Sequence, residues 1–318
     1  MKLPQTLLEK KHFPVMLKEV LSFIPNDKKI NLIDATFGGG GYSKAILKDF
    51  NIKNLIAIDR DPISQIFYEK LKKDFDNIEL FNHRFSKIEE LLENSKHFTE
   101  KYDVIIFDLG LSSNQIDNPE RGFSFQKDGP LDMKMGSSSL NAFEVINSFD
   151  EKKLADIFYE FGEEKYSRRI AKNIVINRTK KTIENTLELS KIIKKSFPAK
   201  HNSNKIHPAT KTFQALRIFI NDELNELKIA LEKSENLLAK NGLLIIVSFQ
   251  SLEDRIVKDF FNHKSGKRWR SSRHLPDLAD LGPTTLKIIT KKPLRPKDFE
   301  INNNPRSRSA KLRVAQKI

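Results

Sequence analysis

The sequence predicts an α/β fold, a Rossmann-like doubly wound sheet that is interrupted by an all-helical insert. Short apolar runs alternate with helical patterns over the first 110 residues, and this alternation is typical of a parallel sheet covered by helices. From residue 110 to about 240 the strand pattern is missing and helical patterns follow a polar loop. An apolar run at Gly242–Phe249 then restores the strand pattern.

The elements expected before the insert follow a regular order. A short amphipathic helix ends at Pro25, and a helix follows each of the next three strands. We expect Asp61-Pro62 to begin the second of these helices as N-cap and first-turn proline, and Ser86–Glu89 to begin the third as a capping box. The predicted strands are Asn31–Phe37, Asn54–Asp59, Ile78–Phe81 and Tyr102–Leu109, and the helices between them include Tyr42–Phe50 and Lys87–Asn94.

The predicted insert contains only helices. A long helix that begins at Pro208 carries one apolar stripe, which indicates core packing. After the insert we expect the strand Gly242–Phe249, a helix capped by Ser251–Asp254, and a last strand at Thr285–Thr290. The sheet domain is therefore predicted at 1–119 and 211–318, and the insert at 120–210. Because ligands bind at the carboxyl edge of such sheets, the insert is expected to form one wall of a substrate cleft.

Composition excludes several classes of protein. The chain has 318 residues and no cysteine, which excludes disulfides, thiolate catalysis and cysteine-ligated zinc. No window of 18 residues is apolar enough for a membrane span, and the first residues lack the apolar core of a signal peptide. We therefore expect a cytoplasmic protein that neither binds a metal nor enters a membrane.

The charge distribution favours a polyanionic partner. The formal net charge is +14, and from Lys287 to Ile318 ten Lys or Arg residues face only two acidic ones. Five more basic residues surround Trp269 between Lys264 and Arg273. Clusters of this kind favour nucleic acid, although a charge run is also a common form of solvated surface.

Four consecutive glycines, Gly38–Gly41, separate the first strand from its helix. Glycine lets a ligand approach the backbone N–H groups closely, and the helix directs its positive end at the turn. The dinucleotide pattern G-x-G-x-x-G fits poorly, because its third glycine falls on Ser43 or Lys44. Asp59, at the end of the second strand, suits the two hydroxyls of a ribose. These features favour a nucleoside cofactor without pyrophosphate, such as S-adenosylmethionine, over a glycine turn with a capping aspartate.

Nine ordered motifs resemble those of the bacterial 16S ribosomal RNA (cytosine-N4) methyltransferase family. The resemblance implies a Rossmann-like S-adenosylmethionine-dependent methyltransferase sheet with an inserted helical substrate-recognition domain. It covers the chain from His12 to about Arg313. The motifs are Asp34–Gly38, Ala57–Pro62, Asp108–Ser113, Arg121–Phe125, Gly129–Met133, His207–Thr210, Thr212–Arg217, Ser251–Arg255 and Asn304–Arg306.

The resemblance also implies a set of cofactor contacts. Asp59 would hold the ribose, and Asp108 would pair with the methionyl ammonium or meet the substrate amine. Phe85 would pack on the adenine, or else it is an ordinary core residue. The full set is Gly40, Gly41, Tyr42, Asp59, Phe85, Asp108 and Gln115.

Two positions depart from the family pattern. Tyr42 stands where the family usually has His, so a main-chain contact is expected there in place of a side-chain contact. Gln250 replaces the His of a frequent Ser-Phe-His-Ser-Leu-Glu-Asp motif, so a histidine at that position is not the general base of this chain.

The resemblance implies methylation of the N4 amine of a cytosine in the decoding centre (P site) of 16S rRNA, within the small ribosomal subunit. Such an amine is a poor nucleophile, and alignment of the reactants lowers the barrier. We expect Asp108 and Ser112 to be catalytic, with Ser113 an alternative to Ser112. Asp132, His207 and Arg217 are candidates for the RNA side, or else for turn and packing roles.

Two other functions stay open at this point: an RNA-binding ribosome assembly factor with little catalysis, and a nucleotide-dependent dehydrogenase, which the missing third glycine disfavours. The sequence does not distinguish a monomer from a homodimer.

Overall fold

The structure is a computed structural model that describes residues 14–198, 207–267 and 283–318. It separates into two compact units. The sheet unit combines Lys11–Gly110 with Leu224–Ile318, and the helical unit includes Leu111–Glu223. The 120–210 segment that the sequence marked as an insert lies inside the helical unit, which extends beyond it at both ends.

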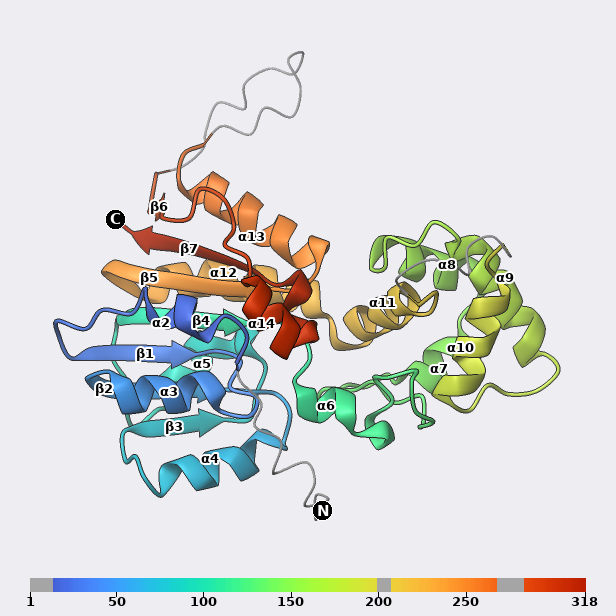
Figure 1. Cartoon of the computed structure of the whole chain (residues 1–318), viewed down its shortest axis with the longest axis horizontal. Helices are drawn as coiled ribbons and strands as arrows, with labels where there is room; N and C mark the ends of the chain where they lie inside the picture. Colours follow the sequence, from blue (N-terminus) through green and yellow to red (C-terminus); the bar gives the residue numbers. More distant parts are fainter. Residues whose placement is uncertain (1–13, 199–206, 268–282) are drawn as a thin grey trace. The chain divides into compact units, whose positions relative to one another are not determined.

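Seven strands form one sheet in the order β3-β2-β1-β4-β5-β7-β6 (Figure 1). Strands β1 to β5 pair in parallel, and β7 runs antiparallel to both of its neighbours. The predicted α/β fold class is confirmed, with one antiparallel strand that the sequence analysis did not predict. The strands are β1 Ile30–Asp34, β2 Ile52–Ile58, β3 Ile78–Phe81, β4 Tyr102–Asp108, β5 Leu238–Ser248, β6 Leu286–Ile288 and β7 Lys311–Lys317.

Helices cover both faces of this sheet. Alternate residues of a strand point to opposite faces, so Leu32 packs into one apolar cluster and Ile33 into the other. This two-sided burial explains why the central strands are nearly continuous apolar runs. One face is covered by α2 Leu17–Leu21, α3 Gly41–Asp49 and α4 Ser64–Lys72, and the other by α5 Ile88–Glu93, α12 Glu223–Leu237 and α13 Ser251–Lys264. Short helices η1 Phe85–Lys87, α14 Asp298–Asn303 and η4 Pro305–Ser309 complete the unit.

The helical unit has its own apolar core, which includes Leu154, Phe158, Ile170 and Phe213. Side-chain caps set the starts of three of its helices, because Asn141, Asp150 and Asn185 each accept a backbone N–H three residues ahead. Its helices are α6 Ser113–Asp117, η2 Pro119–Arg121, α7 Ala142–Ser148, α8 Glu151–Glu160, α9 Ser167–Arg178, α10 Thr186–Lys195 and α11 Thr210–Asn221.

The predicted long helix from Pro208 and the predicted caps at Asp61 and Ser86 were wrong. The long helix from Pro208 is broken, because Asp222 takes a left-handed conformation (φ 54°) that ends α11 before α12 begins. Asp61 does not cap α4, since its carboxylate accepts the N–H of Ile63 inside the preceding turn. Ser86 forms no capping box, because η1 occupies the position where the α-helix was expected to begin.

Asn221, at the end of α11, holds a loop of the helical unit. The side chain is buried, accepts the N–H of Met135 (2.9 Å) and donates to the carbonyl oxygens of Met133 (2.8 Å) and Arg217 (2.8 Å). Met133 itself has a positive φ of 58°, so the loop depends on these bonds to keep its shape.

We expect Asn221→Ala to lower the free energy of unfolding by about 3 kcal/mol, because it leaves buried backbone groups without partners. Urea unfolding followed by circular dichroism measures the effect. The matched control is Asn177→Ala, which removes one exposed bond to the carbonyl of Asn173 and should change stability by less than about 0.5 kcal/mol. Equal losses in the two variants would contradict this role of Asn221.

Candidate active site

The glycine turn lies between β1 and α3. Gly38 and Gly40 have positive φ values of 53° and 73°. A Cβ atom on Gly40 would lie 2.8 Å from the ring of Phe37, and one on Gly41 would lie 2.4 Å from the ring of Pro14. The backbone conformation and the packing of the chain itself therefore require glycine at these positions. The first N–H groups of α3 have no partner within the helix, and that of Ser43 hydrogen-bonds to Asp34. The positive end of the helix favours a negatively charged ligand group at the turn.

The side chain of Tyr42 contacts another part of the chain and not a ligand site at the glycine turn. The ring is buried, and its hydroxyl donates a hydrogen bond to the carbonyl oxygen of Val15. Burial is the main reason that the pKa of Tyr42 is raised well above its ordinary value, so the hydroxyl stays protonated and keeps donating. A cofactor at the turn would therefore meet the main chain of Tyr42.

Asp59 joins the end of β2 to the glycine turn. One carboxylate oxygen accepts the N–H of Gly38 (2.6 Å) and the other accepts the N–H of Asp61 (2.8 Å). A carboxylate has about four acceptor positions, so each oxygen retains capacity for a ribose hydroxyl. Burial raises the pKa of Asp59 to about 6, against the lowering effect of these two hydrogen bonds.

Asp108 ends β4 next to the same turn, where its N–H donates to Oγ1 of Thr36 (2.6 Å). Its Oδ1 is shielded from solvent and, within the described part of the chain, accepts no hydrogen bond. Burial, with added repulsion from Asp34 and Glu253, raises the pKa of Asp108 well above the usual range. A buried carboxyl oxygen that accepts no hydrogen bond from the described residues fits the cationic ammonium of a methionyl group.

Asp34 strengthens the negative character of this edge. It is buried, and its carboxylate accepts from the hydroxyl of Ser43 (2.6 Å) and the N–H of Thr36 (3.3 Å). Burial raises the pKa of Asp34 to about 6 in spite of these bonds. Three carboxyl groups thus lie at the carboxyl ends of adjacent strands, those of Asp34, Asp59 and Asp108. A cation bound there would offset the free-energy cost of burying their negative charges.

Phe85 begins η1 at the same edge of the sheet unit. Its ring lies edge-on to Phe107, with centroids 5.6 Å apart and an interplanar angle of 90°. The neighbouring Arg84 donates to the buried Glu226 on α12 (2.9 Å), which anchors the short helix. Phe85 is half-buried, so the ring contributes to the core and leaves part of its surface exposed.

Ser112 and Gln115 belong to the helical unit, whose boundary falls after Gly110. They form a reciprocal capping box on α6: the Ser112 N–H donates to Oε1 of Gln115 (2.9 Å) and the Gln115 N–H donates to Oγ of Ser112 (3.3 Å). The spacing S-x-x-Q is typical of such a box, so the motif carries a structural signal in addition to the chemical roles expected of it. Both residues stay candidates for the site, with a local structural role in addition.

Sequence reasoning also missed Glu253, the third residue of α13. Its carboxylate accepts the N–H of Phe249 (3.0 Å) and the side-chain amide of Gln250 (2.8 Å). Gln250, which stands in place of the family's histidine, therefore positions a carboxylate that raises the pKa of Asp108. The acidic residue of the S-L-E-D motif was the signal for this carboxylate, and the expected cap at Ser251 was wrong, because Gln250 is the N-cap of α13.

The candidates for the RNA side have different surroundings. Arg217 makes a two-point ion pair with Glu223 (both 2.7 Å), which supports the packing role for this residue. Asp132 lies 3.7 Å from the ammonium of Lys134. His207 is exposed and stacks on Phe125.

Several basic residues expected to contact RNA are engaged within the sheet unit. Lys311 and Arg313 of β7 both bind the carboxylate of Asp254 on α13, at 2.8 and 2.7 Å. These two basic side chains of the Lys287–Ile318 cluster are therefore held by an internal ion pair. Their hydrogen bonds lower the pKa of Asp254 despite its partial burial. Arg268, Arg270 and Arg273 lie outside the described residues.

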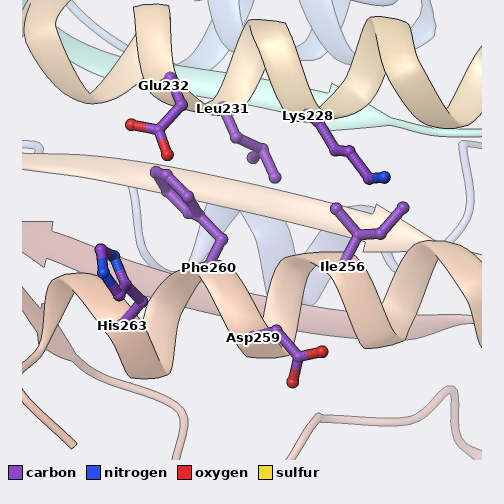
Figure 2. Close-up of a pocket in the computed structure, with 7 residues that line it drawn as sticks. All are labelled: Lys228, Leu231, Glu232, Ile256, Asp259, Phe260 and His263. Carbon is purple, nitrogen blue, oxygen red and sulfur yellow. The ribbon is translucent and has the colours of Figure 1, made fainter. Parts of the chain in front are cut away.

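A cavity of about 390 Å³ lies between α12 and α13 (Figure 2). In Figure 2, Leu231, Ile256 and Phe260 lie between the two helices among charged side chains. The cavity contains none of the predicted site residues. Its lining consists of Lys228, Leu231, Glu232, Ile256, Asp259, Phe260 and His263.

Among the described residues, no helix is long and apolar enough to cross a membrane. In the same ranges, no group of three or more His, Asp or Glu side chains is arranged to hold a metal ion.

Comparison with known proteins gives consistent matches. The model of the MraW methylase family matches residues 9–318. Proteins named ribosomal RNA small subunit methyltransferase H are similar over nearly the whole chain: one from Rickettsia bellii is 46% identical, covering 98% of this chain and 100% of the relative, and one from Rickettsia canadensis is 47% identical, covering 98% and 99%. A third, from Ehrlichia canis, is 46% identical, covering 96% and 100%. A solved rRNA methylase from Streptococcus thermophilus is 11% identical with a TM-score of 0.41, covering 95% of each chain.

Proposed function

The chain belongs to the MraW methylase family, and from this membership we propose that it methylates the N4 amine of a cytosine in the decoding centre (P site) of 16S rRNA. Its relatives carry the name ribosomal RNA small subunit methyltransferase H. The cofactor is S-adenosylmethionine, and the substrate is the RNA within the small ribosomal subunit in the cytoplasm.

The observation that carries the proposal is the buried carboxyl oxygen of Asp108 beside the glycine turn, which has no hydrogen-bond partner among the residues that the structure describes. This oxygen and the N–H groups at the start of α3 would hold the two ends of an amino acid group. Asp59 would accept from the ribose hydroxyls, and Phe85 would pack on the adenine. Gly40, Gly41 and Tyr42 would contribute main-chain contacts, and Gln115 is proposed as a further contact.

The bound cofactor would supply an electrophilic methyl group on a sulfonium. The lone pair of the cytosine amine is delocalised into the ring, so an acceptor that draws one N–H towards itself favours attack in line with the methyl group. We assign this acceptor role to Asp108, assisted by Ser112. The ionised carboxylate of Asp108 would take the proton that the amine loses as the methyl group is transferred.

The 120–210 insert is proposed as the part that recognises the RNA. A large folded RNA presents many phosphates, and phosphate contacts give affinity without sequence information. The choice of target would then depend on RNA shape and on a cytosine that leaves its stack.

We expect efficient methylation of small ribosomal subunits that lack the mark, and little methylation of naked RNA or a short hairpin. The affinity for particles should fall about tenfold or more between 50 and 200 mM salt, because each neutralised phosphate releases counterions. A labelled methyl donor measures both effects, and mass spectrometry of 16S rRNA from cells with and without the protein identifies the nucleotide. Equal rates on hairpin and particle would refute the particle as substrate, and binding without transfer would favour an assembly factor.

A further inference from the structure

Two aromatic rings stack at the surface of the helical unit. The centroids of Phe125 and His207 are 4.6 Å apart, and their planes differ by 20°. Phe125 in turn lies edge-on against Phe213 at 5.1 Å. Phe213 is buried, Phe125 is half-buried and His207 is exposed. The three rings form a series from the core to the solvent, and the imidazole ring of His207 is the outermost of the three.

A hydrogen bond from the backbone orients the outer ring. Nδ1 of His207 accepts the N–H of Ala209 (3.2 Å). Partial burial and the positive charge of Lys194 lower the pKa of His207, so the imidazole is neutral at pH 7 and carries its proton on Nε2. His207 therefore presents a flat, uncharged ring with one N–H donor at its edge.

The loop that carries Phe125 is held rigidly. Gly122 has a positive φ of 69°, and a Cβ there would lie 2.1 Å from the carbonyl oxygen of Pro130. Thr186, the first residue of α10, donates through its N–H to the carbonyl oxygen of Gly129 (2.9 Å) and through its hydroxyl to the carbonyl oxygen of Lys127 (2.9 Å). The stacked pair is thus already formed in the protein without a ligand, so a third ring would bind with little ordering of the loop.

The surroundings of the pair are basic. Lys191, Lys194 and Lys195 on α10 are exposed, and Lys194 is close enough to influence the titration of His207. A ligand that matches both features has a flat aromatic ring joined to negative charge. A nucleotide has this combination, whereas an aromatic protein side chain carries no charge next to its ring.

We propose that Phe125 and His207 form a platform on which an unpaired base of the RNA substrate stacks, with the adjoining phosphates near the lysines of α10. The proposal rests on the proposed function and specifies the form of RNA bound. Proteins that read single-stranded RNA stack its bases on aromatic or histidine rings. Nε2–H of His207 would donate to a base carbonyl or a phosphate oxygen. A base inside a duplex cannot stack here, because its neighbours already cover both of its faces.

The first test compares His207→Ala with His207→Phe in methylation of unmethylated small subunits. Loss of one stacked base weakens binding about tenfold, so His207→Ala should raise KM for the particle about tenfold and change kcat less than twofold. His207→Phe keeps a flat ring, so its KM for the particle should stay within about threefold of the wild-type value. Tyr159→Ala is the matched control, because Tyr159 is an aromatic residue of the same unit that is 65% exposed and lies outside the stack.

The second test needs no methylation. Fluorescence anisotropy at low salt measures binding of a labelled oligocytidine, and of an abasic oligomer of equal length, to the cofactor-free protein. The wild type should prefer the oligocytidine about tenfold, and His207→Ala should lose this preference. Equal binding of both oligomers by the wild type, or a His207→Phe variant as weak as His207→Ala, would overturn the platform. If wild type fails to methylate particles but keeps the base preference, the proposed function fails and the platform stands.

Discussion

Asp108→Asn should lower kcat by a factor on the order of a hundred or more, while KM for the small subunit changes little. The substitution keeps the size of the side chain but removes the negative charge that would hold the methionyl ammonium and take the proton of the amine. Steady-state assays with labelled methyl donor measure the loss. A variant with near-normal turnover would move the catalytic role elsewhere, with Ser112 the next candidate.

The same variant should be more stable than the wild type when no cofactor is bound. Burial raises the pKa of Asp108 above its value in the unfolded chain. The protonated side chain therefore contributes stability at pH values below the unfolded pKa, and this contribution is lost as pH rises through the folded pKa. The amide that Asp108→Asn introduces carries no charge to desolvate. The difference in melting temperature should therefore be largest at pH 8 and vanish near pH 4.

Asp103→Asn is the matched control for this pair of effects. Asp103, near the start of β4, binds Lys28 (2.5 Å) and the N–H of Asn31 (2.9 Å). Its replacement weakens both interactions, so it should lower stability slightly and leave turnover unchanged. A stability gain in both variants would show that the gain at Asp108 does not come from its burial.

Asp59→Ala should abolish measurable binding of S-adenosylmethionine by calorimetry. Two hydrogen bonds from ribose hydroxyls to a charged acceptor contribute roughly 3–6 kcal/mol, and their loss weakens binding by a factor on the order of 100 or more. Asp103→Ala should bind normally. The wild type should not bind NAD, because the dinucleotide pattern is incomplete, and tight NAD binding would overturn the cofactor assignment and favour a dehydrogenase.

The pH dependence of binding provides a second measurement on Asp59. Its pKa is raised to about 6, so the carboxylate is protonated below that pH and loses part of its capacity to accept. Affinity of the wild type should therefore rise between pH 5 and pH 7. In Asp59→Asn, which does not titrate, this rise should be smaller, and an unchanged pH profile would assign the titration to another group such as Asp34, whose pKa is also about 6.

The sequence by itself determined the fold class and the starting point of the site. Apolar runs such as Leu55–Ile58 mark buried strands because both of their faces are covered, and this information is local. Four glycines between a strand and a helix permit close backbone approach for a reason that is also local. Asp59 and Asp108 lie at the carboxyl ends of their strands, and parallel strands bring these ends to one edge of the sheet. Their roles towards cofactor and substrate stay predictions until the variants are measured.

Only the tertiary structure decided features that depend on partners far along the chain. Strand β7 has basic residues between apolar ones and was interpreted as part of a basic cluster that favours nucleic acid, but Lys311 and Arg313 pair with Asp254, which lies 57 and 59 positions away. The break at Asp222 follows Asn221, whose side chain binds a loop more than 80 positions away. Local sequence propensity does not reveal such contacts, because they contribute to the free energy only when the units have folded.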